Sequence, residues 1–219
     1  MTTPEWLLWQ LADSAFPAGA LAHSNGLEAA VHHGLVHDAA SLEEFIHTAV
    51  GQTMRGVLVF VRTARNDPNT FPVADQHCDL FLSNHVSNRA SRAQGRAFLA
   101  AAARIFDLAP VKLLAEQVRT TASPAHFAPV FGVVLNSLQI SRIQTESLFL
   151  YLFMRSCISA AIRLGVAGPL EGQRIQSRMK FASVHSVRSV HSEPAVQTAP
   201  MLDLLQGNQD RLYSRLFQS

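Results

Sequence analysis

Apolar residues recur at helical spacing along almost the whole chain, and this periodicity constrains the fold more than any other feature. No stretch alternates apolar and polar residues between hairpin turns, so no sheet is expected. Ser24, Ser41 with Glu44, and Pro110 stand where helices commonly begin. The pattern predicts an all-α protein with helices over 5–15, 24–34, 41–63, 73–85, 87–108, 127–138, 140–164 and 170–190 and another beginning near Pro110.

The length and apolar content favour a single-domain multi-helix bundle. The chain has 219 residues, of which 48% are apolar and 16% are charged, enough to bury one substantial core. Residues 140–164 are apolar on nearly every side over their second half, so this segment is expected to be the central buried helix. Gly95 lies inside the helix predicted over 87–108, where a missing side chain permits close packing.

The last part of the chain differs from the rest. Pro194 and Pro200 frame a segment of small and polar residues, which divides the chain into a helical domain over 1–191 and a linker with a tail over 192–219. The tail is amphipathic, and it is expected to fold back on the domain or to dock on a partner. Its apolar residues are Leu202, Leu205, Leu212, Leu216 and Phe217.

Several classes of function and location are excluded by composition. The formal charge of +2 is too small for a nucleic-acid-binding surface. The run from Leu148 to Met154 is far shorter than the roughly 20 residues needed to cross a bilayer. Cys78 and Cys157 have no paired spacing, and no secretory signal opens the chain, so a cytoplasmic location without membrane insertion is expected.

Common enzyme signatures are absent. There is no Gly-Lys pair of a Walker phosphate loop, no His-Glu-x-x-His, no Cys-x-x-Cys and no Gly-x-Ser-x-Gly, so the chain is expected to be no enzyme and to hold no cofactor. The early histidines could contact a metal transiently, but His32 and His33 diverge by about 100° on a helix. No fixed metal site is predicted, and surface or packing roles are favoured for His23, His32, His33 and His37.

Five separated motifs in order resemble the UreF family of urease accessory proteins. The first reads Asp-Ser-Ala-Phe-Pro-Ala-Gly-Ala-Leu-Ala-His-Ser-Asn-Gly-Leu-Glu over 13–28, and the second reads Arg-Ala-Ser-Arg-Ala-Gln-Gly-Arg-Ala-Phe over 89–98. The others are the helix start over 126–132, Ala-Ile-Arg-Leu-Gly over 161–165 with Gly172 and Gln173, and Leu-Tyr-Ser-Arg-Leu-Phe-Gln-Ser over 212–219. Leu21 and Asn208 depart from residues common in that family.

The resemblance implies a wholly helical protein that forms a two-fold dimer and serves the assembly of the nickel centre of urease. Its implied partners are the accessory protein UreD (also called UreH), the GTPase UreG and apo-urease. The resemblance also implies that the tail becomes ordered when the complex forms and packs against the N-terminal loop. Two alternatives stay open: a metallochaperone that itself binds nickel, and a regulator that presents an arginine to the GTPase.

Two linked patches are the candidate partner-binding site. Arg215 is expected to donate charge-assisted hydrogen bonds to loop carbonyls or to a carboxylate, whereas Leu27 is expected only to pack in the core. The candidate residues are Pro17, Gly19, His23, Ser24, Gly26 and Glu28 in the loop and helix start, and Tyr213, Arg215, Leu216 and Phe217 in the tail.

Overall fold

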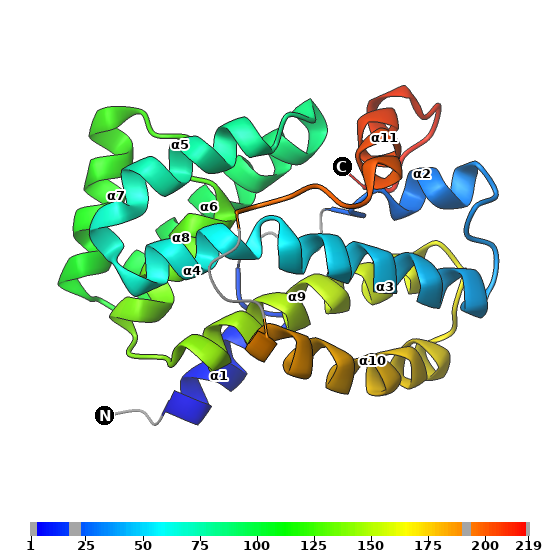
Figure 1. Ribbon diagram of the computed structural model, residues 1–219, viewed down its shortest axis with the longest axis horizontal. Coiled ribbons are helices and arrows are strands. Elements are labelled where there is room, and N and C mark those ends of the chain that lie inside the picture. Colours follow the sequence, from blue (N-terminus) through cyan, green and yellow to red (C-terminus); the bar gives the residue numbers. More distant parts are fainter. Residues whose placement is uncertain (1–3, 18–22, 190–193, 218–219) are drawn as a thin grey trace.

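The computed structural model describes residues 4–17, 23–189 and 194–217, and these ranges contain helices but no strand, which confirms the all-α prediction (Figure 1). The α-helices are α1 (Pro4–Ala12), α2 (Leu27–His32), α3 (Ala39–Arg55), α4 (Leu58–Asn66), α5 (Phe71–Phe81), α6 (His85–Ile105), α7 (Ala109–Thr121), α8 (Phe127–Ser137), α9 (Arg142–Arg163), α10 (Pro169–Ser189) and α11 (Pro200–Asn208). Short 3-10 turns follow α4 and α11, over Pro68–Thr70 and Gln209–Arg211.

The helix predicted over 41–63 is two helices. The backbone at Gly56 has φ −99° and ψ −103°, so α3 ends at Arg55 and α4 begins at Leu58.

The capping box predicted at Ser41 and Glu44 is also wrong. Asp38 is the N-cap residue, its side chain accepts from the Ser41 N–H at 2.8 Å, and the helix therefore begins three residues earlier.

Two helices organise the core. α9 packs against α1, α2, α3, α4 and α10, as expected for a central helix. α8 packs against α4, α5, α6 and α7 and is buried at every position from Phe127 to Leu135, more completely than α9. The aromatic rings of Phe127, Phe131 and Phe149 join the two helices, with centroids 5.4 to 5.5 Å apart. The core is therefore continuous between the two halves of the bundle.

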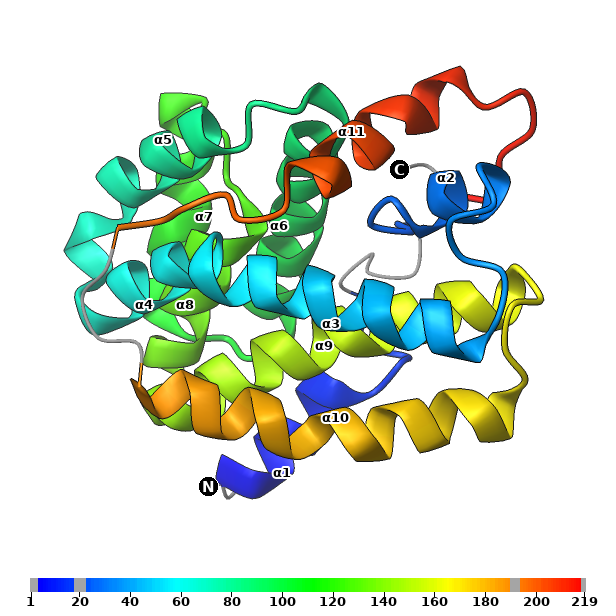
Figure 2. The ribbon, with the colours of Figure 1, turned by 45° about the vertical axis from the view of Figure 1, so that its right-hand side comes forward.

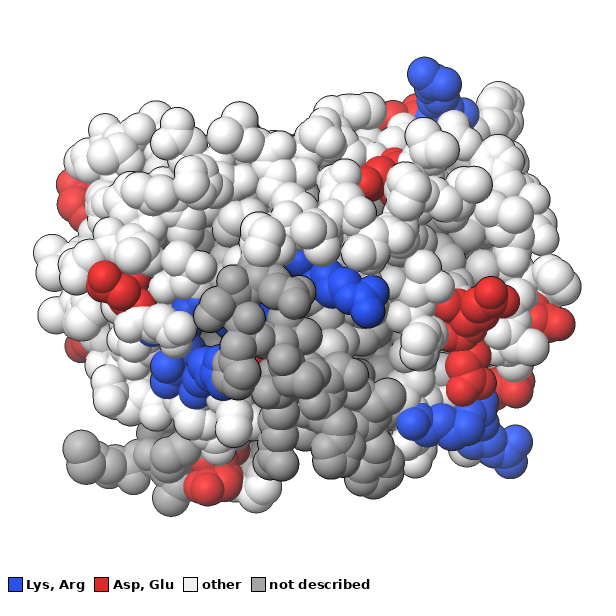
Figure 3. All heavy atoms as spheres, viewed as in Figure 1, with Lys and Arg blue, Asp and Glu red and all other residues white. Residues whose placement is uncertain are grey.

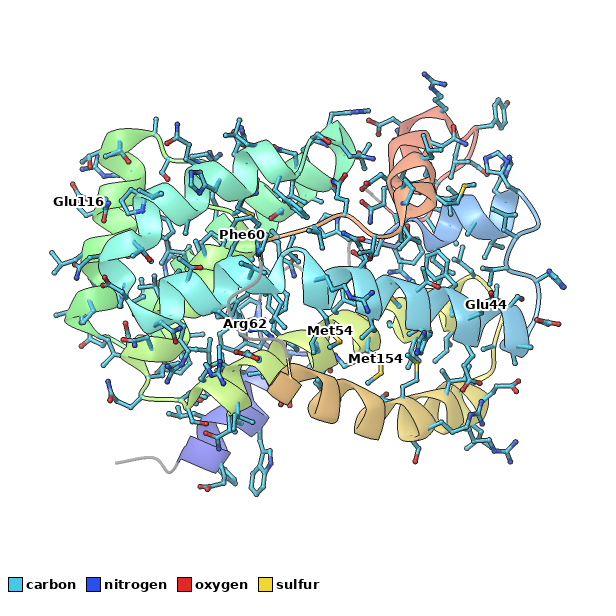
Figure 4. The ribbon with its side chains drawn as sticks, viewed as in Figure 1. Glu44, Met54, Phe60, Arg62, Glu116 and Met154 are labelled. Carbon is cyan, nitrogen blue, oxygen red and sulfur yellow. The ribbon has the colours of Figure 1, made fainter. Side chains whose placement is uncertain are left out.

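Buried side chains fill the layer between α3 and α9. Met54 on α3 and Met154 on α9 lie in this layer (Figure 4).

Arg62 on α4 donates to the Glu146 carboxylate on α9 at 3.1 Å, and the Glu146 side chain is 1% exposed. A carboxylate so deeply buried needs such a partner, and the pair holds α4 against the start of α9.

α9 is the one described helix long and apolar enough to meet the criteria for a membrane span. Of its most apolar window, 61% is buried inside the protein, as in the core helix of a globular domain. Among the described residues on the face in Figure 3, charged side chains of both signs are few and scattered.

The start of α8 is fixed by side chains from α5 and α6. The Asp75 carboxylate accepts from the N–H groups of Ala125 and His126 at 2.8 and 2.7 Å. The fully buried His126 ring contacts Ser91 at 3.1 Å and Asp79 at 2.9 Å through its two nitrogens. These polar groups satisfy one another inside the bundle and set how α6 crosses α8.

Gly95 permits that crossing. A Cβ atom at this position would lie 2.0 Å from the Ala125 carbonyl oxygen, far inside van der Waals contact. The close packing predicted for this glycine is therefore confirmed.

Residues 194–199, here called the strap, lead to α11 across the junction of α3 and α4 (Figures 1 and 2). The Val196 N–H donates to the Arg55 carbonyl at 3.0 Å. The Gln52 side chain donates to the Val196 carbonyl at 3.3 Å and accepts from the Ala199 N–H at 3.0 Å. These bonds pair backbone groups of Val196 and Ala199 in the strap. They hold the strap in a position from which α11 packs against α2.

Candidate partner-binding site

The two predicted patches lie side by side. α11 packs against α2, and both views show these two helices beside each other (Figures 1 and 2). Leu202, Leu205, Leu212 and Phe217 of the tail are buried in the main core cluster. The amphipathic tail is thus folded back on the domain.

Glu28 is the centre of this contact. Its side chain is buried, and one carboxylate oxygen accepts from the Leu216 N–H at 2.6 Å. The other oxygen accepts from the Phe217 N–H at 3.3 Å and from the Gln209 amide. Three donors from the tail thus satisfy a carboxylate that belongs to the helix start.

Gln209 and Phe217 complete the attachment. The Gln209 side chain is fully buried, and its amide nitrogen also donates to the Phe217 carbonyl at 3.4 Å. The Arg163 guanidinium at the end of α9 lies 4.3 Å from the centroid of the Phe217 ring. Phe217 therefore anchors the tail.

Gly26 lets α11 approach the helix start. Its backbone has φ +85°, in the region that favours glycine. A Cβ atom there would lie 3.1 Å from Cγ of Gln206 and 3.2 Å from its backbone nitrogen. Gly26 thus provides both the turn and the room, and the fully buried Leu27 after it packs in the core as expected.

Ser24 does not cap α2. Asn25 and Gly26 both have positive φ, so a turn separates Ser24 from the helix and Gly26 occupies the N-cap position. The Ser24 carbonyl accepts from the Leu27 N–H at 3.1 Å, while its buried hydroxyl has no hydrogen-bond partner among the described residues. The N-cap prediction is wrong because it left out this turn.

The remaining loop residues border a cavity. Pro17 is exposed and His23 is half-buried, and both line a largely apolar cavity of about 490 Å³. Burial and the positive charge of Arg89 lower the pKa of His23, which favours the neutral ring. Gly19 lies outside the described residues.

Arg215 contacts a carboxylate of the tail itself. Its guanidinium donates to Asp210 at 2.9 Å, and Asp210 also accepts from Arg89 on α6 at 3.0 Å. His85 lies 3.2 Å from the same carboxylate. The hydrogen bonds from Arg89 are the main reason that the pKa of Asp210 lies below its ordinary value.

The tail has an inner and an outer face. Phe217 faces the core, whereas Tyr213 is fully exposed and Leu216 is 60% exposed. The side chain of Arg215 is 42% exposed even with its ion pair. Tyr213, Arg215 and Leu216 therefore form an exposed surface, here called the tail surface, on a segment held at Glu28.

Residues that the sequence interpretation missed hold the site together. The Asn25 amide donates to the Ser156 hydroxyl at 3.0 Å and fastens the turn to α9. The Asn84 amide donates to the Asp203 carbonyl and fastens α11 to the start of α6. Gln209 and Asp210 act through contacts that join distant segments, for which the sequence contains no local signal.

No group of three or more His, Cys, Asp and Glu side chains in the described ranges is arranged to hold a metal ion. His33 lies beside the Asn208 amide of the tail, so it takes part in the contact between α2 and α11.

Comparison with known proteins places the chain in a family. The UreF family model matches residues 36–180. The chain belongs to the UreF family. "Urease accessory protein F" of Oryza sativa subsp. indica is 34% identical over 97% of this chain and 84% of that protein. "Urease accessory protein F" of Arabidopsis thaliana is 34% identical over 98% of this chain and 92% of that protein.

A bacterial member gives a similar result. "Urease accessory protein UreF" of Mesorhizobium japonicum is 32% identical over 94% of this chain and 92% of that protein. The match to the UreF family confirms the resemblance seen in the motifs. Its members are named as accessory proteins and not as enzymes, in agreement with the expectation of no catalytic activity.

Proposed function

We propose that this protein is a urease maturation factor that binds UreD/UreH and recruits UreG for nickel insertion into apo-urease. It acts in the cytoplasm as a homodimeric scaffold and holds no cofactor of its own. Membership in the UreF family supports a role in urease maturation, since the relatives are named urease accessory proteins.

The observation that carries the scaffold role is the attachment of the tail at Glu28. The Leu216 and Phe217 N–H groups bind the Glu28 carboxylate, so the tail surface has a defined position on the domain. A surface ordered before binding loses less conformational entropy when a partner docks. Exposed Tyr and Arg side chains on such a surface are the residue types that carry most binding energy at protein interfaces.

The loop and the helix start supply the second half of the scaffold. Gly26 and Glu28 are bonded to the tail or packed against it, so a partner that contacts the tail surface also meets the α2 side of the molecule. The division into a helical domain over 1–191 and a docking tail over 192–219 belongs to this proposal.

Deletion of the gene in its own host tests the function. The proposal expects urease protein that lacks nickel and activity, restored by the wild-type gene and restored poorly by the double variant Tyr213→Ala, Arg215→Ala. Measurement of urease activity and nickel content per urease subunit gives the answer. Fully metallated, active urease in the deletion strain would remove the proposed role.

A further inference from the structure

Four side chains that carry or can carry positive charge follow one face of α6. His85, Arg89, Arg92 and Arg96 are spaced by four, three and four residues, which puts them on the same side of a helix. They line a surface hollow of about 520 Å³ together with Asn88 and the small residue Ala93. Asp210, which also binds Arg215 of the tail surface, lies at one end of this face.

The positive charge of this face is only partly neutralised. Arg89 pairs with Asp210 at 3.0 Å and Arg92 pairs with Asp79. Arg96 is exposed, and the contact described for its guanidinium is a 3.5 Å approach to the Ser123 carbonyl. Three arginines of α6 thus face two carboxylates, one of which also binds Arg215, and Arg96 is the arginine of this face with no carboxylate partner among the described residues.

A second hollow adjoins the first at Arg96. It lies between α6 and α7, has a volume of about 350 Å³, and is lined partly by Arg119, which pairs with Glu116, and by Ser123. Apart from Arg96, the rest of its lining is Leu99, Ala100, Ala115, Val118 and Ala122. These side chains are apolar and mostly small, so another backbone can approach closely. Arg96 therefore lines both the cationic hollow and the largely apolar hollow.

We propose that this α6–α7 surface binds an acidic segment of a partner protein, and this inference rests on the proposed scaffold function. Carboxylates of the segment pair with Arg96 and compete with Asp210 for Arg89, while its apolar side chains fill the hollow at Ala100 and Ala115. Arginine suits this role because its planar guanidinium binds carboxylates through two parallel hydrogen bonds and is weakly hydrated.

Charge reversal at Arg96 is the test. The full-length chain with Arg96→Glu is titrated with purified UreD/UreH, UreG and apo-urease at about 50 mM and about 500 mM salt. The proposal expects about tenfold weaker binding to one of the three at low salt and a much smaller difference at high salt, because exposed charges are screened. Arg104→Glu is the matched control, since Arg104 is an exposed arginine of α6 outside both hollows.

A second variant tests the apolar hollow without a change of charge. Ala100 is exposed, so Ala100→Trp should fold normally and fill the hollow. This variant should weaken binding of the same partner at both salt concentrations. Equal binding by wild type, Arg96→Glu and Ala100→Trp to all three proteins would overturn the inference, and so would saturable binding of inorganic phosphate at Arg96 with no effect on any protein partner.

The tail variant Arg215→Ala separates failure of this inference from failure of the proposed function. Loss of partner binding in Arg215→Ala with normal binding in Arg96→Glu would contradict the α6–α7 surface and leave the scaffold function intact. Normal binding in both variants would contradict both surface assignments, whereas failure of the wild-type chain to bind any of the three proteins would contradict the proposed function.

Discussion

The backbone N–H of Leu216 donates to the carboxylate of Glu28 at 2.6 Å, although 188 residues separate the two in the sequence. This bond joins the start of α2 to the end of the described chain. It is reinforced at Phe217 and Gln209, whose donors use the second carboxylate oxygen. One buried side chain thus sets the position of the tail surface on which the proposed function depends.

Removal of the Glu28 carboxylate should release the tail. In Glu28→Ala, the Leu216 and Phe217 N–H groups lose their acceptor, so their hydrogen exchange should accelerate by about tenfold or more while α8 stays protected. Hydrogen exchange with mass spectrometry measures this change. Glu43→Ala is the control, because Glu43 makes an exposed pair with Arg178 far from the tail. Unchanged exchange over 209–217 would contradict the role of Glu28.

Gly26→Ala should destabilise the protein by about 1–3 kcal/mol, since it adds backbone strain and a Cβ atom pressed against Gln206. Gly34→Ala is a matched control, because Gly34 also has positive φ but a Cβ atom added there would have no neighbour within 4 Å. Thermal unfolding of the two variants isolates the contact with α11. Equal destabilisation by both substitutions would mean that the contact with α11 contributes nothing to the stability lost in Gly26→Ala.

Gly95→Ala should be more damaging than any other glycine change discussed, with a loss of about 3 kcal/mol or more, because the Ala125 carbonyl occupies the space that a Cβ atom needs. Gly51 lies inside α3, and a Cβ atom added there would meet no atom within 4 Å beyond the backbone of its own helix. Gly51→Ala should therefore stabilise the protein by about 0.5–1 kcal/mol. Urea unfolding measures both. A mild effect at Gly95 would show that α6 and α8 can separate at little cost.

The Asp79 network should make stability depend on pH. Hydrogen bonds, above all from Arg92, hold the pKa of the Asp79 carboxyl well below its usual range. The unfolded chain therefore binds this proton first as the pH falls below about 4, and the stabilisation present above that pH is lost. The stability difference between wild type and Asp79→Asn should shrink from pH 5 toward pH 2. A constant difference over that range would contradict this.

Much of the fold could be predicted from the sequence, because helical periodicity reflects which side chains are buried. The helices over 127–138 and 140–164 lie within two residues of α8 and α9. The break at Gly56 was missed because the apolar pattern continues through it. Ser24 was misassigned because the positive φ of Asn25 gives no signal in composition.

The candidate site was only partly predictable. The motifs led to two candidate patches, which stay a prediction as a partner-binding site, but a pattern does not specify which residue touches which. Arg215 does bind a carboxylate, yet that carboxylate is Asp210 of the tail, five residues away. The link between the patches is made by Glu28 and Gln209, and such a contact between distant segments can be seen only in three dimensions.

The central claim is that the tail surface receives the maturation partners. The direct measurement is size-exclusion chromatography of UreD/UreH and UreG mixed with wild type or with Tyr213→Ala, Arg215→Ala. Both side chains are exposed, so the variant should keep the thermal stability of wild type within about 0.5 kcal/mol. We predict a ternary complex with wild type and its loss with the folded variant. An unaltered complex with the variant would contradict the account.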